Sequence, residues 1–253
     1  MQRGFGRHLR GLLPALLAAA PEHHWTLVVD RDAENLPAAE IIRIDARRTV
    51  LNLIRSGRAL SDPRFDVVLF PTLYSYVPIF CRARKIVVIH DVTAELYPEL
   101  TLHPGLGRWL WRLKSALARW QAHALGTVSE HSRRGIKQIF GASTEVIGEA
   151  PDPIFRPMDL PVSRTIAYVG GFAPLKNVPR LLDAFAQIAA QPRFADVNLL
   201  LVGEDRDEAF RWDVEALRRQ AAPLGVRVRF TGFYADEALA QLLNRAWVLA
   251  LPS

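Results

Sequence analysis

The sequence predicts an α/β protein with two domains, each built around a parallel β-sheet. Two observations predict this fold: short apolar runs alternate with amphipathic helical patterns throughout the 253 residues, and a stretch with four prolines and no periodicity interrupts the alternation after Glu149. Alternation of strands and helices specifies parallel sheets joined by right-handed crossovers. We therefore expect a first domain over residues 1–150, a linker over 151–163 and a second domain over 164–253.

In the first domain, apolar runs rich in β-branched residues predict buried strands, and apolar residues at helical spacing predict the helices between them. The predicted strands are Trp25–Asp30, Ile41–Ile44, Val67–Phe70, Ile86–His90, Gly126–Ser129 and Glu145–Ile147. The predicted helices are Phe5–Ala20, Thr49–Gly57, Leu106–Leu125 and Glu130–Phe140.

The second domain repeats the alternation. Strands are predicted at Thr165–Val169, Val197–Val202, Val226–Phe230 and Trp247–Leu251. Helices are predicted at Val178–Ala190, Asp207–Ala222 and Asp236–Arg245. Two such domains joined by a linker place a ligand in the crevice that faces the carboxyl ends of both sheets.

The composition favours a globular protein with anionic ligands. Half of the residues are hydrophobic, and the formal net charge of +6 suits nucleotide diphosphates or acidic lipid headgroups. Zinc-finger spacing and RNP-like motifs are absent from the sequence, so nucleic-acid binding is not expected. The His, Asp and Glu residues show no metal-site spacing either. Cys81 is the single cysteine, which excludes an intrachain disulfide and predicts a cytoplasmic protein.

The turn that follows the first strand of the second domain carries the strongest functional signal. Gly170 and Gly171 permit positive φ and close backbone approach, Asn177 is a candidate N-cap, and Pro179 fits a first helical turn. Backbone N–H groups at a helix N-terminus attract anions, and Lys176 adds a positive charge at the same place. The pattern predicts a diphosphate site, although a plain turn with a solvated lysine fits the spacing equally well.

This turn and its helix, YVGGFAPLKNVPRLLDAFAQI, resemble the donor-site loop and helix of glycosyltransferase family 4, the retaining sugar transferases of the GT-B fold. Further segments resemble parts of that family in the same order, across nearly the whole chain. They are Gly4–Arg10, His90–Glu99, Thr127–Arg133, Pro151–Pro157, Arg229–Phe233 and Ala250–Ser253.

The resemblance implies a GT-B type fold, in which an N-terminal acceptor domain and a C-terminal donor domain, both Rossmann-like, face a cleft. It implies transfer of a sugar from a nucleotide diphosphate sugar to a glycan or lipid-linked acceptor, without cofactor or metal. Likeness to a Gly-Gly-Phe subgroup suggests mannose from GDP-mannose. The family begins with a strand before the glycine loop and continues past Ser253 into an acidic motif. We therefore expect the first domain to lack its first strand, the second to be incomplete, and residues 1–253 to have little or no activity.

By the same resemblance, His90 and Lys176 are the candidate catalytic residues: His90 contacts the transferred sugar, and Lys176 neutralises the leaving diphosphate. The donor-binding candidates are Gly170, Gly171, Lys176, Asn177, Gly232 and Phe233, and the candidates for an acceptor or phosphate loop are Gly4 and Gly6. Gly171 stands where the family often has an arginine. The cradle is therefore expected to be weaker than usual, or to recruit Arg180.

Simpler interpretations stay open for these residues. His90 can cap a strand through Asp91, and the glycine pairs can be plain turns. Gly203-Glu204-Asp205 admits a dinucleotide-dependent enzyme with a ribose-binding carboxylate, but the preceding turn lacks the G-x-G-x-x-G fingerprint. The other alternative is a non-catalytic module that binds a nucleotide or glycan.

The segment Arg108–Trp120 is rich in arginine and tryptophan. A basic aromatic helix can lie on an anionic membrane, which suits an enzyme that uses lipid-linked sugars at the inner membrane face. More often, such a helix packs its tryptophans into the domain and exposes its arginines. We favour the packed helix here, with peripheral membrane contact as the alternative.

Overall fold

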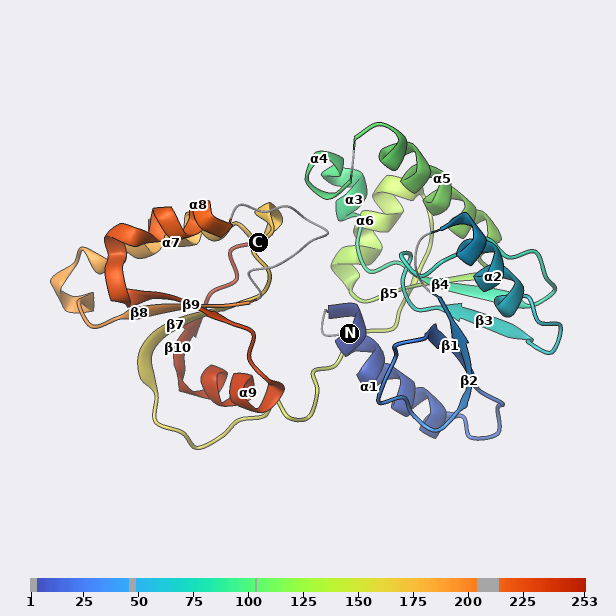
Figure 1. The fold of residues 1–253 in the computed structure, drawn as a ribbon, viewed down its shortest axis with the longest axis horizontal. Helices are drawn as coiled ribbons and strands as arrows, with labels where there is room; N and C mark the ends of the chain where they lie inside the picture. The colour runs from blue at the N-terminus through green and yellow to red at the C-terminus, as the bar shows by residue number, and fades with distance from the viewer. Residues whose placement is uncertain (1–3, 46–48, 103, 204–213) are drawn as a thin grey trace. The chain divides into compact units, whose positions relative to one another are not determined.

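The computed structural model describes residues 4–45, 49–102, 104–203 and 214–253. The chain divides into two compact units, Met1–Asp152 and Pro153–Ser253, which we call unit 1 and unit 2 (Figure 1). Each unit has its own parallel sheet and its own hydrophobic core.

Unit 1 contains a four-stranded parallel sheet in the order β3-β4-β5-β6 and a separate parallel pair, β1-β2. The strands are β1 (Thr26–Asp30), β2 (Glu40–Ile44), β3 (Val67–Phe70), β4 (Arg84–Val88), β5 (Ala124–Thr127) and β6 (Glu145–Val146). The helices are α1 (Gly4–Ala19), α2 (Val50–Leu60), α3 (Thr93–Leu96), α4 (Pro98–Thr101), α5 (Leu106–Gln121) and α6 (Glu130–Phe140). Because the four strands run parallel, the loops after them gather at one edge of the sheet.

Local sequence signals begin and end two helices of unit 1. The hydroxyls of Thr49 and Ser129 each accept a hydrogen bond from a backbone N–H three residues on, at the starts of α2 and α6. Gly141 ends α6 in the left-handed conformation, with φ 66°. Val87 of β4 and Ile136 of α6 are fully buried in the core that these elements enclose.

Unit 2 is a four-stranded parallel sheet in the order β10-β7-β8-β9. Its strands are β7 (Ser163–Val169), β8 (Asn198–Val202), β9 (Val228–Gly232) and β10 (Ala246–Leu249). Its helices are α7 (Val178–Ala189), α8 (Val214–Ala221) and α9 (Asp236–Arg245), with 3₁₀ turns η1 (Pro174–Lys176), η2 (Pro192–Phe194) and η3 (Ala222–Arg227).

The winding of unit 2 reverses between β7 and β10. The connections from β7 to β8 and from β8 to β9 step in one direction across the sheet, whereas the connection from β9 returns to the other side of β7. In Figure 1, α7 and α8 lie along one face of this sheet and α9 lies on the other. Open parallel sheets bind ligands at such a switch point, beyond the carboxyl ends of the strands.

The core of unit 2 explains its sequence pattern. Val178, Leu182 and Phe185 of α7 follow helical spacing, and all three are buried against the sheet. Leu199 and Leu201 of β8 are also buried, and the whole strand is apolar after its first residue because a central strand is covered on both faces.

The predicted α/β fold with parallel sheets is confirmed, and most elements lie within a few residues of their predicted bounds. The predicted helix Leu106–Leu125 is too long: it ends at Gln121, because β5 begins at Ala124. Helices α3 and α4 were not predicted, since single turns show no periodicity. The pair β1-β2 stands apart from the four-stranded sheet in the described part of unit 1.

Two other predictions concern segment ends. Gly4 and Gly6 do not form a loop before the first helix, because α1 already begins at Gly4. The predicted helix start at Asp207 lies outside the described residues, as do Glu204 and Asp205. Within the described ranges, no helix is both long and apolar enough to cross a membrane.

Candidate active site

Three glycines lie at the carboxyl ends of neighbouring strands in unit 2. Gly170 follows β7, Gly203 follows β8 and Gly232 ends β9. Their backbones extend the sheet: Gly170 N–H donates to Val202 O at 2.9 Å, and Gly203 N–H donates to Gly232 O at 3.1 Å. A Cβ on Gly203 would lie 2.0 Å from Gly170 O, so only glycine fits there. The edge of the sheet is therefore backbone without side chains at these three points.

Tyr168 holds the loop that follows β7. Its hydroxyl donates to the carbonyl of Gly171, and its ring is only 2% exposed. Burial raises the pKa of Tyr168 to about 12, so the hydroxyl keeps its proton and remains a donor at neutral pH. Gly171 itself is exposed, and a Cβ there would meet nothing within 4 Å. This role of Tyr168 was not predicted, since the alternation in a strand does not show which side chain reaches the following loop.

The prediction for Asn177 is confirmed for its N-cap position, but its side chain does not cap the helix. Asn177 occupies the N-cap position of α7, but in the left-handed conformation (φ 53°), and its side chain makes no capping hydrogen bond. Its Nδ2 instead donates to Pro252 O at 3.2 Å, which ties the loop to the segment after β10. Asparagine tolerates the left-handed region better than most residues, so the turn still depends on this residue type.

The 3₁₀ turn η1 uses two of the backbone N–H groups that the sequence assigned to an anion. Lys176 N–H donates to Ala173 O at 2.7 Å, and Asn177 N–H donates to Pro174 O at 2.9 Å. Among the described residues, no backbone acceptor is recorded for the N–H of Gly171. Three groups near the loop can therefore bind an anion. They are the Gly171 N–H, the backbone N–H groups in the first turn of α7 and the exposed side chain of Lys176.

Gly232 is the last residue of β9, and Phe233 follows it directly. Gly232 adopts φ 73°, which glycine accepts without strain, and the side chain of Phe233 is 46% exposed. An exposed aromatic ring at the end of a strand suits a flat apolar ligand such as a nucleotide base.

His90 lies at the carboxyl edge of the sheet in unit 1, as the sequence predicted for its position. Strand β4 ends at Val88, but Ile89 N–H still donates to Gly126 O at 2.9 Å. Thr127 Oγ1 donates to Ile89 O at 2.7 Å. These bonds to β5 fix the backbone immediately before His90.

The His90 ring contacts groups from three other segments. Its Nε2 lies 3.0 Å from Pro71 O in the loop after β3, and its Nδ1 lies 3.3 Å from Glu149 Oε1. The ring also meets His8 of α1 edge to face, with the ring centroids 5.1 Å apart. Burial lowers the pKa of His8. The charge of Glu149 raises this pKa by less, and the nearby His90 makes a smaller contribution that lowers it.

A small pocket lies beside His90, lined also by Asp91, Ala94 and Trp111. The carboxylate of Asp91 accepts a hydrogen bond from Thr93 N–H at 2.8 Å, at the start of α3. Asp91 thus supports the start of α3. The contacts given above for the His90 ring are to Pro71, Glu149 and His8, so they differ from the alternative in which His90 pairs with Asp91.

Residues 163–253 match the family described as glycosyl transferases group 1. The match runs from β7 to β10 and includes Gly170, Gly203, Gly232 and Lys176. The match covers less than half of the chain, so it is a likeness of this segment to the family. The resemblance to glycosyltransferase family 4 is consistent with this broader assignment. The comparison with curated proteins gave no match.

Solved glycosyltransferases share the fold of the chain. Sucrose-phosphate synthase from Thermosynechococcus elongatus is 20% identical, with a TM-score of 0.74 over 99% of this chain and 70% of that chain. WaaG, a glycosyltransferase involved in lipopolysaccharide biosynthesis, is 16% identical, with a TM-score of 0.67 over 99% of this chain and 71% of that chain. Anabaena HepE in complex with UDP-glucose is 19% identical, with a TM-score of 0.62 over 94% of this chain and 64% of that chain. The GT-B fold is confirmed by these likenesses.

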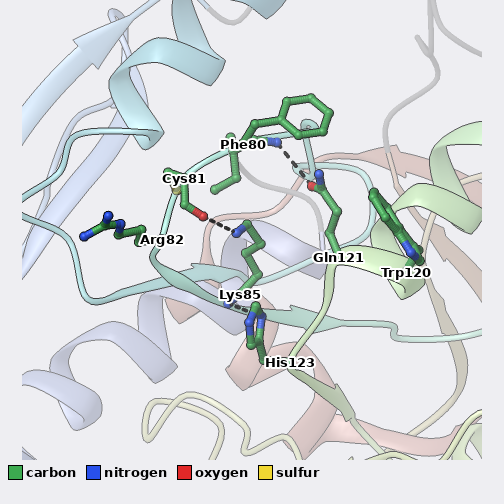
Figure 2. Close-up of a pocket in the computed structure, with 8 residues that line it drawn as sticks. Phe80, Cys81, Arg82, Lys85, Trp120, Gln121 and His123 are labelled. Carbon is green, nitrogen blue, oxygen red and sulfur yellow. Dashed lines mark hydrogen bonds between the residues drawn. The ribbon is translucent and has the colours of Figure 1, made fainter.

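Unit 1 also has an open pocket, which lies away from His90. Phe80, Lys85, Trp120 and His123 line it (Figure 2). The Lys85 ammonium is buried there and donates to the carbonyls of Cys81 and Ala83, at 2.9 Å each. Lys85 lies near the start of β4, so this pocket is at the amino ends of the strands, where parallel sheets do not place their ligands.

Helix α5, also outside the group 1 segment, has an apolar exposed face. Its exposed large hydrophobic residues are Leu106, Trp109, Leu110, Leu113 and Trp120. Trp111 packs inside and donates to Glu95 Oε1 at 2.8 Å. The guanidinium of Arg119 lies over the ring of Phe140 at 3.9 Å from its centroid. The expectation that α5 buries its tryptophans is wrong for Trp109 (59% exposed) and Trp120 (73% exposed).

Glu95 is a partly buried carboxyl beneath α5. Burial raises its pKa, and the hydrogen bond from Trp111 and the charge of Arg119 lower it by less. A carboxyl whose pKa is higher in the folded state stabilises the fold below its unfolded pKa of about 4.5. That contribution is lost as the pH rises through the folded pKa.

Glu95→Gln is therefore expected to gain stability relative to the parent as the pH rises from about 4.5 to 7. Glutamine can accept the Trp111 indole bond without a charge. Urea unfolding at several pH values measures the difference. Glu99→Gln, on the exposed side of α4, is the matched control and should show a difference independent of pH. A constant Glu95→Gln difference across this range would contradict the prediction.

Proposed function

We propose that the chain acts as a retaining glycosyltransferase that moves a sugar from a nucleoside diphosphate donor to a glycan or lipid-linked acceptor. The observation that carries the proposal is the set of glycines at the carboxyl ends of β7, β8 and β9, with Lys176 just before α7. All of these residues lie inside the group 1 match. Solved structures of the similarly folded HepE hold UDP and UDP-glucose, which supports a nucleotide sugar as donor.

In this proposal, the loop after β7 receives the leaving diphosphate. Gly170 and Gly171 let the phosphates approach the backbone, and Lys176 and the first turn of α7 meet the negative charge that develops as the glycosidic bond breaks. Asn177 sets the turn between η1 and α7. No metal is needed for this step, because the lysine and the helix N-terminus supply the positive potential.

The remaining site residues have proposed roles of their own. The backbone at Gly232 and the exposed ring of Phe233 hold the nucleotide base. His90 contacts the transferred sugar, in the role that the family resemblance implies, with its ring oriented by Pro71 O. Gly4 and Gly6, in the first turn of α1, contribute a helix N-terminus for an acceptor or phosphate group. The family resemblance suggests mannose as the donor sugar, and the assay with UDP- and GDP-sugars tests this.

Binding of nucleotides to the full chain tests the proposal. Isothermal titration should give a Kd in the micromolar range for UDP or GDP, at least about tenfold tighter than for the matching monophosphate, because the second phosphate adds a charge-assisted contact. Comparable affinities for mono- and diphosphates would contradict the diphosphate site. Tighter binding of NAD than of either diphosphate would favour the dinucleotide enzyme. Incubation with UDP- and GDP-sugars and glycan acceptors then separates a transferase from a binding module.

We further propose that α5 contacts an anionic membrane, where a lipid-linked acceptor would lie. Its exposed apolar face carries two tryptophans, and the helix has four basic residues and no acidic one. Apolar side chains and nearby positive charge are the two contributions that bind amphipathic helices to such surfaces.

The double variant Trp109→Ser/Trp120→Ser should therefore bind anionic phosphatidylglycerol vesicles about tenfold more weakly in co-sedimentation, because two large apolar side chains no longer enter the interface. Leu51→Ser/Leu53→Ser, on exposed positions of α2, is the control and should bind like the parent. Equal binding to neutral and anionic vesicles would rule out the electrostatic part of the contact.

A further inference from the structure

His8, His90 and Glu149 form a cluster that the sequence spacing did not show. They come from α1, the loop after β4 and the loop after β6, and one ligand atom from each lies within 4.8 Å of the others. The side chains of His8 and His90 are 8% and 9% exposed, whereas Glu149 is 49% exposed. The cluster is thus buried on the histidine side and reachable from solvent on the carboxylate side.

The hydrogen bond of His90 decides which of its nitrogens faces the carboxylate. Pro71 O can only accept, so Nε2, 3.0 Å away, must carry the hydrogen. In the neutral ring, Nδ1 then presents a lone pair toward Glu149 Oε1. Two acceptors facing each other need a cation between them, either a proton on Nδ1 or a metal ion.

The distances favour a metal ion over a proton. A charge-assisted N–H···O bond normally measures about 2.7–2.9 Å, but Nδ1 and Oε1 are 3.3 Å apart. Two ligands on a tetrahedral ion at about 2.0–2.1 Å are separated by about 3.3–3.4 Å. His8 Nδ1 lies 3.6 Å from the same oxygen, close to a second edge of such a tetrahedron.

The surroundings of the His90 ring also fit a metal site. A metal-binding histidine usually donates its second N–H to a backbone carbonyl, as His90 does to Pro71. His8 differs from His90 in this respect, because among the described residues its buried Nε2 has no hydrogen-bond partner.

We propose that His8, His90 and Glu149 bind one divalent transition-metal ion, with Zn²⁺ the best match to two imidazoles and one carboxylate. Mg²⁺ and Ca²⁺ prefer oxygen ligands and fit the set poorly. Three protein ligands leave a fourth position, on the exposed side of Glu149, for water or an anionic oxygen. The ion would occupy the lone pair of His90 Nδ1, so this nitrogen could accept a hydrogen bond only in the metal-free protein. The site shares His90 with the proposed sugar contact, but metal binding is measured without sugar transfer, so the two proposals can fail separately. The metal site departs from the metal-free expectation above.

Metal binding to the full chain tests the site. After dialysis against a chelator, Zn²⁺ is titrated in competition with a chromogenic chelator, and Co²⁺ is followed by its visible absorption. One equivalent of Zn²⁺ should bind, and both His8→Ala and Glu149→Gln should weaken binding about 100-fold, since each removes a direct ligand. His131→Ala, an exposed histidine of α6, should bind Zn²⁺ like the parent.

Glu149→Gln keeps the test valid if His8→Ala does not fold, because Glu149 is half exposed. Zn²⁺ should raise the melting temperature of the parent and of His131→Ala, but not of Glu149→Gln. No stoichiometric Zn²⁺ binding, or equal binding by the parent and Glu149→Gln, would overturn the metal site.

Discussion

Gly203→Ala is expected to lower the local stability of the unit 2 sheet by about 3 kcal/mol, the upper end of the usual cost of overpacking. The added Cβ would lie 2.0 Å from Gly170 O, and that carbonyl belongs to backbone rather than to a side chain that can rotate away. Relief requires β7 and β8 to separate at their carboxyl ends. Hydrogen exchange of amides in β7 and β8 measures the loss strand by strand.

Gly171→Ala is the matched control for this change. A Cβ there would meet nothing within 4 Å, and Gly171 is not among the glycines with positive φ. Its stability should stay within about 0.5 kcal/mol of the parent, as for most surface substitutions. If Gly203→Ala proved as stable as Gly171→Ala, the close approach of the two strand ends would be wrong, and the diphosphate site would lose its backbone platform.

The architecture of unit 2 could be predicted because its sequence pattern is local. The apolar run of β8 and the spacing of Val178, Leu182 and Phe185 each follow from burial of one element against its neighbours. Gly170 and Gly232 could be singled out for a related reason, since a glycine after a strand commonly marks a turn. The clash that reserves Gly203 for glycine depends on the register of two strands, which no single segment reveals.

The candidate site was harder to predict where residues distant in sequence meet. His90 followed from its place after an apolar strand, but His8 and Glu149 reach it only through the packing of α1 and the loop after β6. The side-chain cap expected of Asn177 is absent because η1 already closes the turn, which leaves that residue in the left-handed region. The exposed Trp109 could not be told from the packed Trp111 either, since neighbouring helix positions differ only in the face they occupy.

Lys176→Ala is expected to weaken the binding of UDP or GDP by between about ten- and a hundredfold. A contact to a charged group contributes about 1.5–3 kcal/mol, and the loop has lost the N–H groups of Lys176 and Asn177 to η1. The lysine ammonium is thus a large share of what remains for the phosphates. Lys176→Arg should restore part of the affinity, because a guanidinium keeps the charge but changes the geometry. Isothermal titration at constant ionic strength measures each Kd, since salt screens an exposed contact.

The comparison of nucleotides makes the Lys176 test specific. The loss should be large for diphosphates and small for monophosphates, because the proposed contact is to the leaving diphosphate rather than to the base. Lys137→Ala removes an exposed lysine of α6 and should leave both affinities unchanged, which accounts for the general change in net charge. Arg180→Ala, alone and combined with Lys176→Ala, tests whether that exposed arginine of α7 also reaches the phosphates. If Lys176→Ala weakened the mono- and diphosphates equally, the charge would act by long-range attraction alone, and the diphosphate would have to bind elsewhere than at the start of α7.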